Sequence, residues 1–180
     1  YLLSGEFEKA VGVFSKLVSM EDDNPVYHCL LGEALLAAGR YEEFENAYRR
    51  AGLIEPDNED RYLFQAAGLY MEKHLPERSV GLITRCLALA PGKSLYHCAL
   101  GDALVAMNRP EDAFAAYEEA CLADPAQAAA YWNRLGNSLM KGELFSHAVK
   151  AFEAALAFDP QTPCRHQLEA AKARIQLKGG

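Results

Sequence analysis

The chain has 180 residues, of which 51% are hydrophobic, and its 25 acidic and 18 basic residues give a formal net charge of −7. No cluster of Lys and Arg stands out along the chain. Nucleic-acid binding requires a stripe of basic residues, so we expect no nucleic-acid partner. No segment approaches the roughly 20 uninterrupted apolar residues of a membrane helix, so we expect no direct membrane insertion. Ala and Leu are abundant and no strand-like run of Val, Ile and Thr occurs, so the composition favours an all-α protein.

The cysteines argue against a disulfide framework. Their number is odd, and all of them lie inside apolar helical patterns rather than at loop corners. A reducing compartment fits this pattern best, and we expect the protein to be cytoplasmic. The residues are Cys29, Cys86, Cys98, Cys121 and Cys164.

Four prolines recur at nearly equal spacing. Pro56, Pro91, Pro125 and Pro160 are separated by 35, 34 and 35 residues, and three of them end the motifs Ile-Glu-Pro, Ala-Asp-Pro and Phe-Asp-Pro. A period of about 34 residues predicts repeats that each consist of two antiparallel helices.

The predicted repeats follow one another along the chain. Residues 1–24 form a partial repeat, in which GEFEKAVGVFSKL at 5–17 is a second helix and Tyr1–Leu3 is the stump of a first. Residues 25–58 form a complete repeat, with PVYHCLLGEALLAAG as its first helix and YEEFENAYRRAGLIEPD as its second. Residues 60–93 form a weaker copy with Ala66-Ala67, Ser79 and Cys86 at the signature positions.

Two clear repeats and a final helix complete the chain. The signature residues of the repeats at 94–127 and 129–162 are Leu100-Gly101, Ala113, Tyr117 and Ala120 in the first, and Trp132, Leu135-Gly136, Ala148, Phe152 and Ala155 in the second. Residues 163–180 contain the amphipathic segment CRHQLEAAKARIQLK, whose polar side is typical of a capping helix.

This combination of period and residues resembles the tetratricopeptide repeat family over essentially the whole chain. The resemblance implies an all-α fold, a right-handed α-solenoid of helix-turn-helix repeats that forms one continuous domain with a C-terminal capping helix. The recurring glycines and small residues would let paired helices approach closely, and the recurring aromatic residues would fill the space between pairs. Most of the stability would then come from the interfaces between neighbouring repeats.

The resemblance also implies a binding surface, because the first helices of such repeats line a concave groove. The expected lining is apolar with a few polar points, which suits an extended or helical peptide that is mainly apolar. The positions that the family register assigns to this groove are Val26, Cys29, Glu33 and Leu36; Arg61, Phe64, Gly68 and Met71; Leu95, Cys98, Asp102 and Val105; and Ala130, Asn133, Asn137 and Met140.

The predicted function is therefore a protein interaction module or scaffold that binds a protein or peptide. One alternative is a small chaperone of a bacterial secretion system. Another is a structural module that self-associates through its partial N-terminal repeat, or a targeting arm of a larger protein. The cationic clamp with which some family members hold a terminal carboxylate is absent at the matching positions, where Glu33 and Asp102 would also repel a carboxylate.

Few features suggest chemistry. The segment YHCLLGEAL at 27–35 returns as YHCALGDAL at 96–104, so His28-Cys29 and His97-Cys98 could be mistaken for metal ligands. Adjacent helical residues point about 100° apart, and the copies lie two repeats apart, so we interpret them as a duplicated packing unit. With no phosphate loop, nucleophile turn or zinc-binding helix motif in the sequence, we expect no catalytic residues, cofactor, metal or enzymatic activity.

Overall fold

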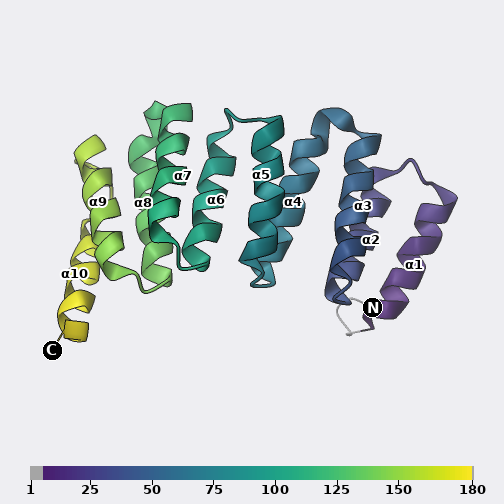
Figure 1. Ribbon diagram of the computed structural model, residues 1–180, viewed down its shortest axis with the longest axis horizontal. Coiled ribbons are helices and arrows are strands. Elements are labelled where there is room, and N and C mark those ends of the chain that lie inside the picture. The colour runs from purple at the N-terminus through teal and green to yellow at the C-terminus, as the bar shows by residue number, and fades with distance from the viewer. Residues whose placement is uncertain (1–5, 180) are drawn as a thin grey trace. The chain divides into compact units, whose positions relative to one another are not determined.

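The computed structural model describes residues 6–179, and its ordered elements in that range are ten α-helices and two short 3₁₀ turns, with no strand (Figure 1). The predicted all-α helical-repeat fold is confirmed, and the predicted stump at Tyr1–Leu3 lies outside the described residues. The helices are α1 (Phe7–Met20), α2 (Pro25–Ala37), α3 (Tyr41–Ile54), α4 (Glu59–Glu72), α5 (Pro76–Leu89), α6 (Ser94–Ala106), α7 (Pro110–Ala123), α8 (Ala128–Lys141), α9 (Phe145–Phe158) and α10 (Arg165–Gly179).

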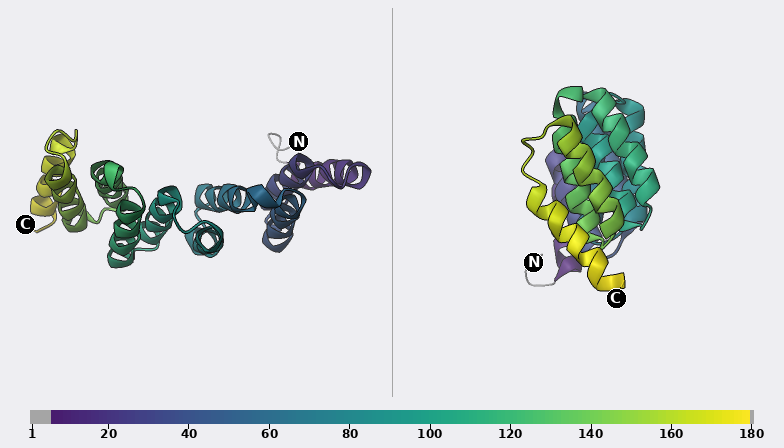
Figure 2. Two further views of the ribbon diagram at one scale, coloured as in Figure 1. Left: turned by 90° about the horizontal axis from the view of Figure 1, so that it is seen from above. Right: turned by 90° about the vertical axis from the view of Figure 1, so that its left-hand side faces the viewer.

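The chain divides into two compact units, Tyr1–Leu69 and Tyr70–Gly180. In the first unit, α2 packs against α1 on one side and α3 on the other. In the second unit, each helix from α5 to α10 packs against the next, and α10 lies beside α9 in the right-hand view of Figure 2. Across the described range, no helix combines the length and the apolar composition needed to cross a membrane.

Four turns, which join α2 to α3, α4 to α5, α6 to α7 and α8 to α9, each contain one residue in the left-handed backbone region. These residues are Gly39 (φ 77°), His74 (φ 57°), Asn108 (φ 57°) and Glu143 (φ 58°). In the first turn the amide of Gly39 donates to the Leu36 carbonyl and that of Arg40 to the Leu35 carbonyl, and the other three turns repeat this pattern. These hydrogen bonds satisfy carbonyl groups in the last turn of the first helix, as is usual where a helix ends with a residue in the left-handed conformation. Only the first of the four turns has the glycine that the left-handed conformation favours.

Glycines in the first helices allow a close approach to aromatic rings on the second helices. A Cβ atom at Gly101 would lie 2.4 Å from the ring of Tyr117, and one at Gly136 would lie 2.4 Å from the ring of Phe152. Both rings are fully buried, so neither has room to retreat. The glycine of the Leu-Gly pair is thus a packing requirement of the α6–α7 and α8–α9 pairs.

The acidic residue before two of the periodic prolines accepts a hydrogen bond from a tyrosine. The hydroxyl of Tyr62 donates to Glu55 Oε2 at 2.7 Å, and the hydroxyl of Tyr131 lies 3.1 Å from Asp124 Oδ2 and 2.8 Å from Ser94 Oγ. In both places the proline opens a single 3₁₀ turn that leads into the next first helix. The contact therefore fastens the connection between consecutive repeats.

Candidate functional site

The second unit contains an open groove with a volume of about 790 Å³. Its walls come mainly from α6 and α8, the first helices of two consecutive repeats, and the end of α4 with the following turn closes one side. We call it the α6–α8 groove. Its lining residues are Met71, His74, Asp102, Val105, Ala106, Ala130, Asn133, Arg134, Asn137, Ser138, Lys141 and Gly142.

A carboxylate with three hydrogen-bond donors lies in the wall of this groove. Asp102 Oδ1 accepts from the Tyr117 hydroxyl at 2.9 Å, and Asp102 Oδ2 accepts from Arg134 Nε at 3.0 Å and Nη2 at 2.6 Å. Burial of Tyr117 and the neighbouring carboxylate both raise the pKa of its hydroxyl. Burial alone would lower the pKa of Arg134, but the charge of Asp102 and its hydrogen bond, together with the neighbouring Tyr117 and Cys98, outweigh this effect and raise that pKa. The arginine therefore compensates the negative charge of Asp102, so this carboxylate repels an anionic ligand less than its sequence position alone predicts.

The equivalent tyrosine of the first unit differs. Tyr48 lies against Gly32 as Tyr117 lies against Gly101, and both rings are buried. Within the described residues, however, the hydroxyl of Tyr48 has no hydrogen-bond partner. The two tyrosine rings thus share their packing, but only the Tyr117 hydroxyl forms a hydrogen bond.

Two amides on α8 provide unused hydrogen-bonding capacity. The side-chain nitrogen of Asn137 donates to the Asn133 carbonyl at 2.9 Å and approaches the Asn133 Oδ1 at 3.3 Å. These contacts orient both amides, because they fix which atom of Asn137 is the donor. Among the described residues, the side-chain nitrogen of Asn133 and the side-chain oxygen of Asn137 take no protein partner. One donor and one acceptor are the groups that a peptide unit of a ligand requires.

The structure brings together some of the residues that the sequence assigned to a groove and separates others. Six of them line the α6–α8 groove: Met71, Asp102, Val105, Ala130, Asn133 and Asn137. Cys98 is fully buried in the core of the second unit, and Met140 is partly buried against that core. Leu95 is 49% exposed at the start of α6. Of these positions, Cys98 is closed to a ligand in this arrangement.

The remaining assigned residues lie in the first unit or on α4. Cys29 and Leu36 are buried, and Glu33 and Phe64 are half-buried. Val26 is 59% exposed at the start of α2, and the exposed side chain of Arg61 donates to Asn58 Oδ1 at 3.2 Å. A pocket in the first unit is lined by residues of α1, its N-terminal flank and the end of α2, and it includes none of the assigned positions. The groove positions there stay predictions.

Sequence reasoning missed four polar residues of the groove, His74, Arg134, Ser138 and Lys141. The family register selects one row of positions on each first helix, and Arg134 lies one residue beyond that row. A signal was present, because Arg134, Ser138 and Lys141 have the i, i+4, i+7 spacing of one helical face. That spacing could have added them to the row of Asn133 and Asn137.

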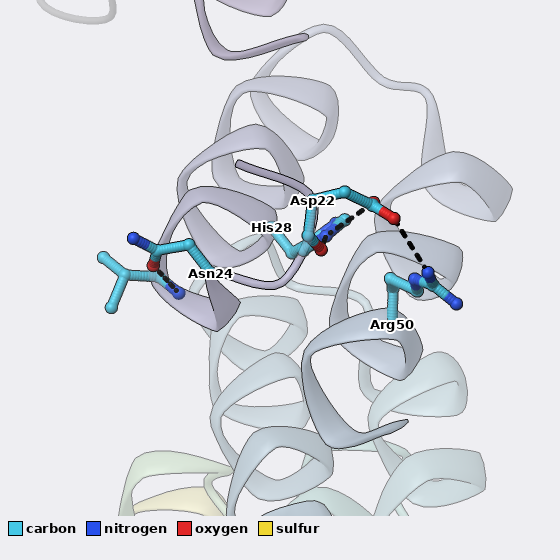
Figure 3. A network of polar contacts seen from close by, with 5 residues as sticks. Asp22, Asn24, His28 and Arg50 are labelled. Carbon is cyan, nitrogen blue, oxygen red and sulfur yellow. Dashed lines mark hydrogen bonds and ion pairs between the residues drawn. The ribbon is translucent and has the colours of Figure 1, made fainter. Parts of the chain in front are cut away.

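The repeated His-Cys pairs have structural roles. His28 Nε2 lies 2.8 Å from the Asp22 carbonyl oxygen, and His97 Nε2 lies 2.8 Å from the Pro91 carbonyl oxygen; each nitrogen donates, because a carbonyl only accepts. In the first pair the Asp22 carboxylate also binds Arg50 at 2.9 Å, while Asn24 caps α2 (Figure 3). Each histidine therefore fastens the loop before its helix.

The thiols of these pairs are unreactive in this environment. Burial raises the pKa of Cys29 and that of Cys98 to about 11, so both thiols are protonated near neutral pH. Over the part of the chain that the structure describes, no group of three or more His, Cys, Asp or Glu side chains is arranged to hold a metal ion.

Comparisons with known proteins agree with this architecture. One family model described as a tetratricopeptide repeat matches residues 1–68, and a second model of the same description matches residues 98–163. No curated protein sequence matches the chain.

Several solved structures are similar in fold. One is MamA from Desulfovibrio magneticus RS-1, with a TM-score of 0.56 at 18% identity, which covers 90% of each chain. Another is YrrB, described as a TPR protein with an unusual peptide-binding site, with a TM-score of 0.56 at 15% identity over 97% of this chain and 84% of that one. A chain of the APC/C hetero-tetramer Cut9-Hcn1 has a TM-score of 0.56 at 16% identity, over 97% of this chain and 35% of that one.

The two matched stretches together cover most of the chain, and the helix pairs, the close contacts between glycine and aromatic rings and the similar structures agree with them. The chain therefore belongs to the tetratricopeptide repeat family.

Proposed function

We propose that the chain binds an extended segment of a protein partner in the α6–α8 groove and has no catalytic role. The observation that carries the proposal is the pair of amides at Asn133 and Asn137, which offers an unused donor and an unused acceptor beside apolar surface. Apolar surface with a few oriented polar groups is typical of sites that bind peptides.

The dimensions of the groove support an extended ligand. Its lining on α8 runs from Ala130 to Lys141, which corresponds to about 16 Å along a helix axis at 1.5 Å per residue. An extended chain advances about 3.3 Å per residue, so about five residues would fit along this wall. Met71, Val105 and Ala106 would provide the apolar contacts on the other walls.

The polar residues of the groove give little support to catalysis. Asp102 is already bound by Tyr117 and Arg134, and the nearby thiol of Cys98 is buried and protonated. A general base needs an accessible site for the proton that it removes, and a nucleophile needs a thiolate or an adjacent base.

The proposal can be tested with the full chain and a library of random peptides. Peptides that the chain enriches would be added to the isotope-labelled protein, and we expect NMR shift changes to concentrate on α6 and α8, including the side-chain amides of Asn133 and Asn137. Replacing both asparagines by Ala should weaken binding about ten-fold, since each lost hydrogen bond is worth about 0.5–1.5 kcal/mol.

Asn46→Ala is the matched control, because Asn46 is an exposed amide on the second helix α3. Its affinity for the same peptides should equal that of the unmodified chain. Shift changes confined to the second helices α7 and α9, or equal weakening by the control, would contradict the proposal.

A further inference from the structure

The charge of the α6–α8 groove is opposite to that of the chain as a whole. The chain has a net charge of −7, whereas the groove is lined by one carboxylate, Asp102, against the cations of Arg134 and Lys141 and the imidazole of His74. A surface that departs in this way from the overall charge favours a ligand of the opposite sign.

The single carboxylate adds little negative potential to the groove. Both oxygens of Asp102 already accept hydrogen bonds, and Arg134 lies within 2.6 Å of one of them. Arg134 uses Nε–H and one hydrogen of Nη2 in these contacts, which leaves three of its five N–H donors available. A cationic side chain of a ligand would therefore compete with Arg134 for Asp102, while an anionic one would find unused donors.

Lys141 is the uncompensated charge of the groove. Its side chain is exposed, and it forms no ion pair with any residue that the structure describes. It is the last residue of α8, where a cation is also favourable to the helix dipole, and that role leaves its three donors available to a ligand. It lies seven residues after Arg134, which corresponds to about 10 Å along the same helical face.

We propose that the segment bound in the α6–α8 groove carries an Asp or Glu residue whose side-chain carboxylate pairs with Lys141, next to apolar side chains that contact Met71 and Val105. This inference rests on the proposed function. The ligand class is thus an internal, acidic and partly apolar peptide segment rather than a wholly apolar one.

The test uses random peptides fused through their C-termini to a phage coat protein, so that side chains supply the only carboxylates near the randomised positions. The full chain should enrich sequences in which Asp or Glu lies beside apolar residues. Enriched sequences would then be synthesised with acetylated and amidated ends, and their affinity measured by fluorescence polarisation for the unmodified chain and for Lys141→Glu. We expect the affinity to fall about ten-fold in Lys141→Glu and to decrease as salt is added.

Lys150→Glu is the matched control, since Lys150 is an exposed lysine on α9 outside the groove and its replacement changes the net charge equally. It should change the affinity less than two-fold. Circular dichroism would verify that both variants keep the helical content of the unmodified chain.

The outcomes separate this inference from the proposed function. Enriched peptides that bind α6 and α8 but are neutral or basic, or that bind equally to Lys141→Glu and Lys150→Glu, would overturn the inference and leave the proposed function standing. Failure of the chain to enrich any peptide would overturn both.

Discussion

Replacing Gly101 by Ala should destabilise the second unit markedly. The added Cβ atom would lie 2.4 Å from Tyr117 Cδ2, 2.5 Å from Tyr117 Cε2 and 3.3 Å from the Ala113 carbonyl oxygen. Side-chain carbon atoms do not approach one another so closely, and the fully buried ring of Tyr117 has no open space to move into. The two helices must therefore separate, or the ring must tilt.

The magnitude follows from three contributions. Overpacking of a core costs about 1–3 kcal/mol, and Ala recovers about 1 kcal/mol through its greater helix propensity. A tilted ring would also disturb the hydrogen bond from Tyr117 to Asp102, and hydrogen bonds to a charged group are worth about 1.5–3 kcal/mol. A partial loss of that bond gives an expected net destabilisation of about 2 kcal/mol.

Urea unfolding, followed by circular dichroism, measures this change, and Gly81→Ala serves as the control. Gly81 lies in the helix α5, and a Cβ atom there would meet nothing within 4 Å. The control should therefore stabilise the protein by about 0.5–1 kcal/mol. If Gly101→Ala unfolded within about 0.5 kcal/mol of the unmodified chain, the close approach of helix and ring would not be a constraint, and the reasoning would be refuted.

Three further predictions concern the turns, the buried thiol and the ion pair. Gly39 and Glu143 both have positive φ, which only glycine adopts without strain, so Gly39→Ala should lower the free energy of unfolding by about 1 kcal/mol and Glu143→Gly should raise it by about 0.5 kcal/mol. Thermal unfolding measures both changes, and melting-temperature shifts of the same sign in the two variants would contradict this reasoning. Burial raises the pKa of Cys98 from 9.0 to about 11, so this thiol contributes stability that is fully present below pH 9 and is lost as pH rises toward 11. The urea midpoint should therefore fall less steeply with pH in Cys98→Ala than in the unmodified chain, and an equal dependence on pH in the two proteins would contradict this prediction. Arg134→Ala should lower the free energy of unfolding by about 1 kcal/mol, after allowance for the partial exposure of the side chain. In a double-mutant cycle, most of this loss should be absent when Arg134→Ala is made in the Asp102→Asn background, whereas additive losses would show that the two residues are not coupled.

The fold could be predicted because its constraints are local and repeat along the chain. The spacing of Pro56, Pro91, Pro125 and Pro160 sets the period, and the glycine and aromatic positions identify which helices pair. The same register applies to each copy and predicts a weak copy at 60–93, where the structure has α4 from Glu59 to Glu72 and α5 from Pro76 to Leu89.

The candidate site was less predictable, because a first helix is packed on several sides. In α6 the buried residues include Tyr96, Cys98, Leu104 and Val105, which are distributed around the helix, so hydrophobic periodicity does not identify the face that lines a groove. The contact between Asp102 and Arg134 joins residues 32 positions apart on two different helices. A register derived one repeat at a time does not include such a contact.

The left-handed turn at His74 has a consequence for the evolution of the groove. A glycine there would relax the backbone, yet it would leave that part of the lining without a side chain. Binding in the groove and thermal stability therefore place opposite demands on this position. We expect homologues with glycine at this turn to have a higher free energy of unfolding and lower selectivity among ligands. Homologues with larger residues there should differ in the ligands that they bind while keeping the same helices.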